Sequence, residues 1–159
     1  MIKKVLSGGQ TGVDRAALDA ALEAGIPCGG YVPKGRLAED GRVPGKYPMQ
    51  ECDSEDYAVR TFLNVRHSDA TLILARGKPG GGTLFTKRVC LDLGKPVRVI
   101  DLEECGPRQA LERASDFLRR ERPSILNVAG PRESGSPGIY VLSFSLLREV
   151  FISMKEKIL

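Results

Sequence analysis

The sequence is poor in the residues that build most metal centres and hydrolytic triads. It has no tryptophan and one histidine, His67. A site with three histidine ligands is therefore excluded, and a Ser-His-Asp triad would have to be built on that residue. The four cysteines are Cys28, Cys52, Cys90 and Cys105, and none lies in a C-x-x-C pair. We therefore expect reduced thiols in a cytoplasmic protein and no direct ligation of a metal by the protein.

Long apolar runs, a signal-peptide pattern and long basic runs are also missing. We expect no membrane as partner, because a spanning helix needs about 20 apolar residues. We also do not expect an exported chain, because the signal-peptide pattern is missing. The net charge of +4 is modest and scattered, which argues against nucleic acid and is compatible with an anionic ligand. With 42% hydrophobic and 28% charged residues among 159, the chain is predicted to form one domain over residues 1–159.

Strand-like and helix-like segments alternate along the chain. The expected strands are 2–6, 26–32, 70–75, 97–102 and 125–129, and the expected helices are 11–24, 53–66, 83–93, 107–120 and 139–157. Residues 33–49, rich in proline and glycine, are expected to be a long loop. This alternation predicts an α/β protein with a Rossmann-like, doubly wound, mainly parallel sheet of about five strands. The chain is too short for an eight-stranded barrel.

Glycine follows four of the expected strands. The segments are 7–12 (SGGQTG), 33–36 (PKGR), 76–83 (RGKPGGGT) and 130–135 (GPRESG). In an open parallel sheet, ligands bind outside the carboxyl ends of the strands. Glycine lets the backbone approach a ligand closely, and a helix N-terminus offers unpaired N–H groups to an anion. A single such turn often only packs a helix on a strand, but three that lead into helices predict a shared cleft for phosphate. Neither G-x-G-x-x-G nor the P-loop is present.

Several polar residues carry a functional and a structural interpretation. Asp14, Glu39 and Asp40 are the candidate acids or bases if the protein is an enzyme. Pairing with the helix dipole explains Asp14 equally well, and a position in a solvated loop explains Glu39 and Asp40 equally well. A polar stripe at Tyr57, Thr61 and Asn64 is interpreted as the solvated face of a helix, and His67 as a surface residue.

At these segments the sequence resembles a known family, the proposed molybdenum-cofactor carriers in the circularly permuted, YpsA-related branch of the SLOG superfamily. The matching stretches are GGQTGVDRAALDAAL, PKGRLAEDG, YPMQE, RTFLNVRHSDATLIL, GGGTLFT, LGKP and LNVAGPRESGSPGIY, in this order from residue 8 to about residue 140. The resemblance implies a Rossmann-like fold and a small phosphate-bearing ligand, either molybdenum cofactor (molybdopterin) or a nucleotide derivative. A carrier would hold the pterin phosphate and need not ligate the metal.

The resemblance also suggests which residues form the ligand cleft. They are Gly8, Gly9, Gln10, Thr11, Gly12 and Arg15; Lys34 and Arg36; Gly81, Gly82 and Thr83; and Gly130, Pro131 and Arg132. Arg15, Arg36 and Arg132 would be the counter-charges of the phosphate.

A related SLOG branch, the cytokinin-activating phosphoribohydrolases, has the motif P-G-G-x-G-T-x-x-E. Residues 79–86 read PGGGTLFT, so one residue is missing and Thr86 stands at the glutamate position. This departure argues against N-glycosidic cleavage and leaves the phosphate cradle intact. A binding protein is therefore the first hypothesis, with a nucleotide-processing hydrolase and a nucleotide-sensing regulatory domain as alternatives. A homo-oligomer is compatible with the sequence.

Overall fold

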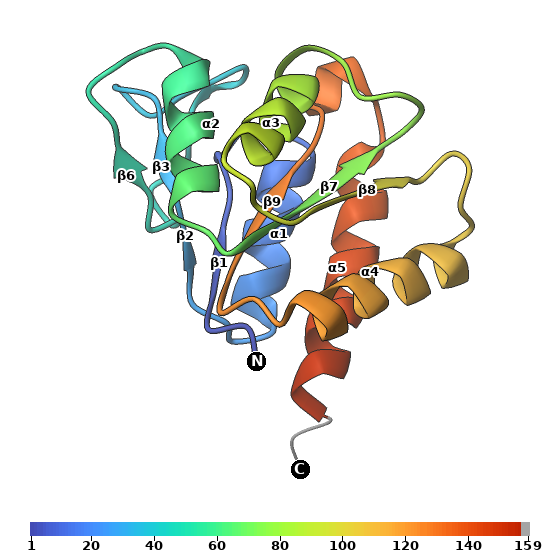
Figure 1. The fold of residues 1–159 in the computed structure, drawn as a ribbon. Coiled ribbons are helices and arrows are strands. Elements are labelled where there is room, and N and C mark those ends of the chain that lie inside the picture. Colours follow the sequence, from blue (N-terminus) through green and yellow to red (C-terminus); the bar gives the residue numbers. More distant parts are fainter. Residues whose placement is uncertain (157–159) are drawn as a thin grey trace.

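The computed structural model describes residues 1–156, and its centre is a five-stranded parallel sheet (Figure 1). The strands are β1 (Lys4–Leu6), β2 (Cys28–Gly29), β7 (Ala70–Ala75), β8 (Val97–Asp101) and β9 (Ile125–Ala129). Their spatial order is β2-β1-β9-β7-β8, and every neighbouring pair is parallel. This topology confirms the predicted Rossmann-like α/β fold.

Five helices cover the two faces of the sheet. The helices α1 (Val13–Glu23), α4 (Pro107–Glu121) and α5 (Ile139–Glu156) pack on one face, with α5 against both α1 and α4. The helices α2 (Tyr57–Arg66) and α3 (Gly81–Asp92) pack against each other on the opposite face. Strand β7 is buried along its whole length, because its neighbours β9 and β8 and both helix layers surround it. Its sequence ATLILA is the continuous apolar run typical of a central parallel strand.

The position of β9 decides where a ligand can bind. This last strand is inserted between β1 and β7, so the carboxyl ends of three strands that are distant in sequence lie side by side. The turn after β9 also lies very close to its neighbours. A Cβ atom at Gly130 would be 2.3 Å from the Leu74 carbonyl oxygen and 2.5 Å from Val13 Cγ2. Glycine at this position therefore allows β9, β7 and α1 to meet at the sheet edge.

The expected strand 26–32 is divided by Gly30. Residues before it form β2 of the main sheet, and residues after it form β3 (Tyr31–Val32), which pairs with β6 (Gln50–Glu51) in a small second sheet. Gly30 has φ 126°, and a Cβ atom there would lie 2.2 Å from the Ser7 carbonyl oxygen. The chain changes sheet at this point because the backbone passes too close to β1 for any side chain.

The expected loop 33–49 contains a hairpin. Strands β4 (Leu37–Ala38) and β5 (Gly41–Arg42) pair antiparallel, with Glu39 and Asp40 at the tip. Gly41, the first residue of β5, follows this two-residue tip with φ 112°, a conformation that favours glycine.

The expected helices exist, but some of their ends differ from the prediction. Helix α1 begins at Val13 instead of residue 11, because Gly12 with φ 78° still belongs to the turn. Helix α2 begins at Tyr57 instead of residue 53, because the Asp56 side chain accepts the Ala58 N–H at 2.9 Å as N-cap. The last helix was expected to reach residue 157, which lies outside the described residues.

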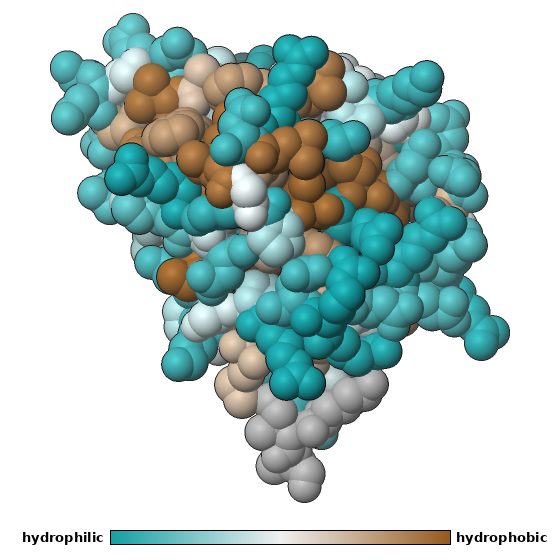
Figure 2. All heavy atoms as spheres, viewed as in Figure 1, coloured by the Kyte–Doolittle hydropathy of each residue, from teal (hydrophilic) through white to brown (hydrophobic). Residues whose placement is uncertain are grey.

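The outer face of α2 and α3 carries exposed apolar side chains (Figure 2). They include Val59 and Phe62 of α2 and Phe85 and Leu91 of α3, each more than a third exposed.

No helix within residues 1–156 combines the length and the apolar character needed to cross a bilayer.

Candidate functional site

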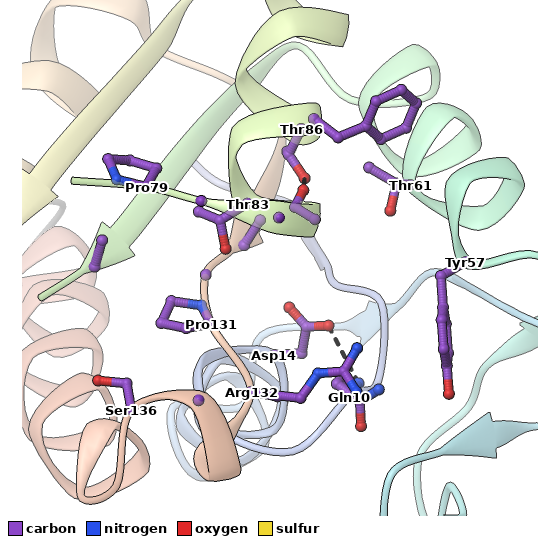
Figure 3. A pocket seen from close by; sticks show the side chains of 18 of the residues that line it. Gln10, Asp14, Tyr57, Thr61, Pro79, Thr83, Thr86, Pro131, Arg132 and Ser136 are labelled. Atoms are coloured by element: carbon purple, nitrogen blue, oxygen red, sulfur yellow. Dashed lines mark hydrogen bonds between the residues drawn. The ribbon is translucent and has the colours of Figure 1, made fainter. Parts of the chain in front are cut away.

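A cleft of about 590 Å³ opens beyond the carboxyl ends of β7 and β9 (Figure 3). Its wall is formed by residues 75–76, 78–83 and 85–86, which lead from β7 into α3, and by residues 129–132 and 135–136 after β9. Gln10 and Asp14 contribute from the start of α1, and Tyr57, Ala58, Arg60 and Thr61 contribute from α2. The cleft thus lies at the strand ends where an open parallel sheet binds its ligands.

The N-terminus of α3 offers free backbone donors to this cleft. The N–H groups of Gly80, Gly81 and Gly82 donate to no acceptor within residues 1–156. A Cβ atom at any of the three would meet nothing within 4 Å, so packing does not require glycine here, although Gly81 has φ 51°. Three unpaired donors at the positive end of a helix, beside open space, form a favourable environment for an anion.

The charges that line the cleft are mainly positive. Arg60, Arg76, Lys78 and Arg132 line it, and among residues 1–156 the only acidic side chain in the lining is that of Asp14. The side chain of Arg132 is 46% exposed. The guanidinium groups of Arg132 and Arg60 each lie 5.6 Å from the ring centre of Tyr57, an arrangement that steadies both cations by cation–π contact. The field of this rim favours negatively charged ligands.

Asp14 is a buried carboxyl group in the cleft wall. It is 3% exposed, and its Oδ2 accepts the Gln10 N–H at 3.1 Å and lies 3.5 Å from Arg60 Nη1. Burial raises the pKa of Asp14, although Arg60 and the Gln10 N–H act in the opposite direction. The group is therefore easier to protonate than an exposed aspartate.

The first glycine-rich turn uses its own N–H groups internally. The Gly9 N–H donates to Ser7 Oγ at 3.3 Å, and the Gln10 N–H is taken by Asp14. The Thr11 N–H donates to the side-chain oxygen of Gln10 at 3.1 Å. This turn was expected to present free N–H groups to a ligand, but the protein's own acceptors occupy these three.

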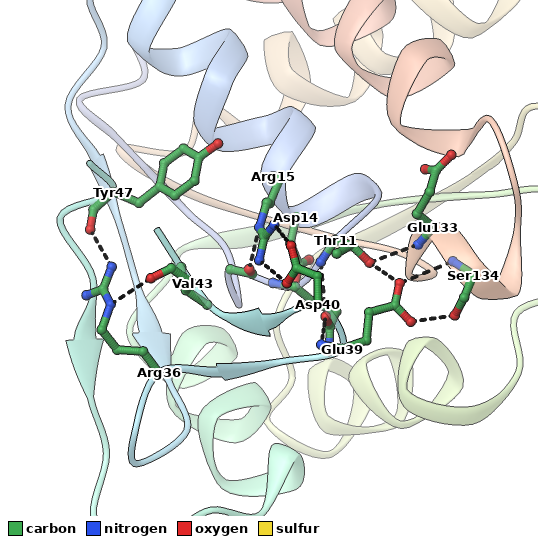
Figure 4. Close-up of polar contacts among 12 residues, drawn as sticks. Thr11, Asp14, Arg15, Arg36, Glu39, Asp40, Val43, Tyr47, Glu133 and Ser134 are labelled. Atoms are coloured by element: carbon green, nitrogen blue, oxygen red, sulfur yellow. Dashed lines mark hydrogen bonds and ion pairs between the residues drawn. The ribbon is translucent and has the colours of Figure 1, made fainter. Parts of the chain in front are cut away.

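The hairpin tip connects the start of α1 to the turn after β9 (Figure 4). The Glu39 carboxylate accepts the hydroxyl groups of Thr11 and Ser134 and, at 3.2 Å, the Ser134 N–H. Arg132 Nη1 lies 3.9 Å from it. The hydrogen bonds from Ser134 and Thr11 hold the pKa of Glu39 below its usual range. Glu39 therefore fixes the position of the segment that carries Arg132.

Asp40 and Arg15 form a separate contact next to the cleft. Arg15 Nη2 donates to Asp40 Oδ1 at 2.8 Å, and Arg15 Nε donates to the Gly9 carbonyl oxygen at 3.2 Å. The Arg15 guanidinium holds the pKa of Asp40 below its usual range. Of the three candidate acids or bases, only Asp14 lines the cleft.

Arg36 supports the long connection rather than the cleft. Its guanidinium donates to the carbonyl oxygens of Val43, Pro44 and Tyr47 at 3.1, 2.8 and 3.0 Å. Lys34 is exposed and is not among the lining residues either. The second glycine-containing turn therefore does not join the other turns at the cleft.

The structure brings together about half of the residues suggested by the resemblance. Those that line the cleft are Gln10, Gly81, Gly82, Thr83, Gly130, Pro131 and Arg132. Those that do not line it are Gly8, Gly9, Thr11, Gly12, Arg15, Lys34 and Arg36. Gly12 has a packing role, since a Cβ atom there would lie 2.5 Å from the Pro131 carbonyl oxygen.

Sequence reasoning missed the contribution of α2. The stripe at Tyr57, Thr61 and Asn64 was interpreted as a solvated face, and this interpretation was wrong. Tyr57 and Thr61 line the cleft, and Asn64 is buried. The Asn64 amide accepts the Tyr31 N–H at 2.8 Å and donates to the Ser7 carbonyl oxygen at 3.3 Å. The polar stripe itself was the available signal.

Within residues 1–156, no three His, Cys, Asp or Glu side chains gather closely enough to hold a metal ion.

The fold and the cleft together define a Rossmann-like α/β protein with a positively charged, ligand-sized cleft at the end of its sheet. The sequence pattern of the circularly permutated YpsA SLOG family matches residues 5–151, so the chain belongs to that family.

The chain is also similar to a solved structure. This is the crystal structure of a "putative molybdenum carrier protein" from Syntrophus aciditrophicus SB, with 46% sequence identity, 95% of each chain covered and a TM-score of 0.92. No curated protein is significantly similar to the chain.

Proposed function

We propose that this protein binds a small, phosphate-bearing molecule in the cleft and holds it without ligating a metal. The observation that carries the proposal is the group of free N–H donors at Gly80, Gly81 and Gly82, next to the cations of the rim. Arg132 is the counter-charge that we assign to the phosphate. Thr83 and the turn at Gly130 and Pro131 form the adjoining wall.

The energies are sufficient for this function. A hydrogen bond to a charged group contributes about 1.5–3 kcal/mol net. Micromolar affinity corresponds to about 8 kcal/mol, so three backbone donors and one or two arginines can hold a phosphate together with modest contacts elsewhere. The cleft volume of about 590 Å³ is within the range of small-molecule sites.

Molybdenum cofactor, as molybdopterin, and a nucleotide derivative are the ligands that we consider. The name of the Syntrophus protein supports the first, and the pterin of that cofactor bears a phosphate that suits the N-terminus of α3. The metal would be cargo held through the pterin. We place this function in the cytoplasm, because all four cysteines are free thiols.

A nucleotide-processing hydrolase is the second candidate, and one observation favours it. Asp14 is a carboxyl group in the cleft wall with a raised pKa, as a general acid requires. Thr86, at the position of the glutamate in the phosphoribohydrolases, instead donates its hydroxyl to the Gly82 carbonyl oxygen at 2.9 Å. The second candidate would therefore depend on Asp14 alone.

The test is a thermal-shift panel with inorganic phosphate, AMP, GMP, ADP-ribose and molybdopterin, followed by calorimetry. We expect at least one organic phosphate to stabilise the protein, and Arg132→Ala to lose most of that stabilisation. Arg108→Ala is the matched control, because this arginine is 92% exposed and pairs only with Glu112 within the described residues. A panel without any shift, or equal binding by both variants, contradicts the proposal. Release of a free base that Asp14→Asn abolishes would establish the hydrolase instead.

A further inference from the structure

The side chain of Gln10 has a fixed orientation that leaves one buried donor unused. Its Oε1 accepts the Thr11 N–H at 3.1 Å and the Glu39 N–H at 2.9 Å. Because both partners are donors, the amide oxygen must face them, and Nε2 must point away from them. Gln10 is 5% exposed and lines the cleft, and Nε2 has no acceptor within residues 1–156.

A carboxyl group lies beside the backbone of the same residue. The Asp14 carboxyl group is within one hydrogen bond of the Gln10 backbone, at 3.1 Å, and points into the same cleft (Figure 3). Arg60 Nε is a second buried donor without a partner among the described residues. The floor of the cleft, formed by Gln10, Asp14 and Arg60, therefore combines unused donors with a carboxyl group. The side of the cleft at the start of α3 offers the backbone N–H donors of Gly80, Gly81 and Gly82 and nearby cations.

The two ends of the cleft select different chemistry. A buried donor without a partner is unfavourable, so a ligand atom that accepts from Gln10 Nε2 would remove this cost. A second phosphate at this end would meet the Asp14 carboxylate and be disfavoured. An uncharged group that donates to Asp14 and accepts from Gln10 satisfies both side chains.

We propose that Gln10 and Asp14 form a specificity subsite for an uncharged group that carries a hydrogen-bond donor next to an acceptor. This inference rests on the proposed function, which places the phosphate of the same ligand at the start of α3. Two sources supply the required chemistry. One is a pair of sugar hydroxyl groups, and the other is the polar edge of a nitrogen heterocycle, where N–H and an acceptor atom are neighbours.

Three probes separate the two ends of the cleft. Inorganic phosphate reports on the α3 end alone, ribose 5-phosphate adds the hydroxyl groups, and GMP adds a heterocycle edge. Binding is measured by NMR titration of the backbone N–H signals, with those of Gly80, Gly81 and Gly82 as direct reporters. For the wild-type protein we expect ribose 5-phosphate or GMP to bind at least tenfold more tightly than phosphate.

Asp14→Asn gives a result that distinguishes recognition from simple charge. If Asp14 acted only as a negative charge in the cleft, its removal would strengthen the binding of every anion. If Asp14 accepts a hydrogen bond from the ligand, Asp14→Asn should lower the affinity for the organic phosphate at least tenfold and should not lower the affinity for inorganic phosphate. Loss of affinity for ribose 5-phosphate identifies the sugar hydroxyls, and a loss confined to GMP identifies the heterocycle. Asp53→Asn, an exposed carboxylate, is the matched control.

Gln10→Glu is the second variant, in case Asp14→Asn does not fold. Glutamate keeps the oxygen that accepts from Thr11 and Glu39 and replaces the Nε2 donor by an acceptor. We expect the ratio of organic-phosphate affinity to phosphate affinity to fall at least tenfold. Two results would overturn the subsite. One is an unchanged ratio of organic-phosphate affinity to inorganic-phosphate affinity in both variants. The other is a wild-type protein that binds organic phosphates no more tightly than inorganic phosphate. Absence of any phosphate response at Gly80–Gly82 would instead overturn the proposed function.

Discussion

The backbone N–H of Glu39 donates to the side-chain oxygen of Gln10 at 2.9 Å. This bond connects the tip of the β4–β5 hairpin to the floor of the cleft, although no hairpin residue lines the cleft itself. The Glu39 carboxylate also holds Thr11 and Ser134. The hairpin is therefore a support that fixes both Gln10 and the segment that carries Arg132.

Replacing Glu39 by glutamine tests this support. The backbone bond to Gln10 is kept, but the charged acceptor for Thr11 and Ser134 is lost. We expect the free energy of unfolding near neutral pH to fall by about 1 kcal/mol, a modest loss because the network is partly open to solvent. The melting temperature should fall by about 2–4 °C. Glu55→Gln, an exposed glutamate without a hydrogen bond or ion pair in the described residues, should leave both quantities unchanged.

The effect of Glu39 should depend on pH with a definite sign. Its folded-state pKa is lowered, chiefly by the hydrogen bonds from Ser134 and Thr11. A lowered pKa contributes stability above the unfolded pKa of about 4.5, and this contribution is lost as the pH falls through the folded pKa. The stability difference between wild type and Glu39→Gln should thus shrink toward zero in acid. Urea denaturation at about pH 7 and about pH 3 measures it, and a difference independent of pH would exclude the carboxylate as its cause.

Asp14 should show the opposite pH dependence. Burial raises its folded-state pKa, so its contribution is present below the unfolded pKa and is lost as the pH rises through the folded value. Relative to Asp14→Asn, which does not titrate, the wild type should lose stability as the pH rises. Denaturation curves of both proteins from about pH 4 to about pH 8 test this. A wild type that gains stability over the variant with rising pH would show that Arg60 dominates over burial.

The sequence predicted the parallel sheet well, because buried strands such as ATLILA have strong local signals, but it did not predict that the strand 26–32 would be divided between two sheets. It could not predict which N–H groups stay free. The turn at residues 8–12 and the turn at residues 80–82 look alike in sequence, yet Asp14 and the Gln10 side chain occupy donors of the first. The role of Arg36 was equally hidden, because its three carbonyl partners come from a connection without regular periodicity. Such pairings depend on tertiary contacts.

Gly82→Ala should separate stability from binding. Gly82 lies in the first turn of α3, its φ is not positive, and a Cβ atom there meets no protein atom within 4 Å. Alanine should therefore stabilise the protein by about 0.5–1 kcal/mol through reduced freedom of the unfolded chain. The same methyl group would occupy the space where a phosphate approaches the free N–H groups, so affinity for phosphate should fall at least tenfold.

Gly45→Ala is the matched control for this prediction. Gly45 also has open space around its Cβ position and no positive φ, but it lies outside the cleft. Its alanine variant should bind phosphate like the wild type, as measured by the same NMR titration. Equal phosphate affinity of Gly82→Ala and Gly45→Ala would place the anion away from the start of α3.

Arg36→Ala and Arg132→Ala should differ in the quantity that each changes. The Arg36 guanidinium donates to three carbonyl oxygens and lies outside the cleft. Its removal should lower the free energy of unfolding by about 1.5–3 kcal/mol and leave the affinity of the folded protein for an organic phosphate within about twofold of wild type. Arg132, half-exposed at the rim, should show a small change in stability and a large loss of affinity.

Thermal denaturation and calorimetry on the same two preparations measure both quantities. Each variant removes one arginine and lowers the net charge by the same amount, so a change in net charge alone does not distinguish the two proteins. If Arg36→Ala lost affinity as strongly as Arg132→Ala, the long connection would have to close over the ligand, and Arg36 would act as the phosphate counter-charge that the family resemblance implied.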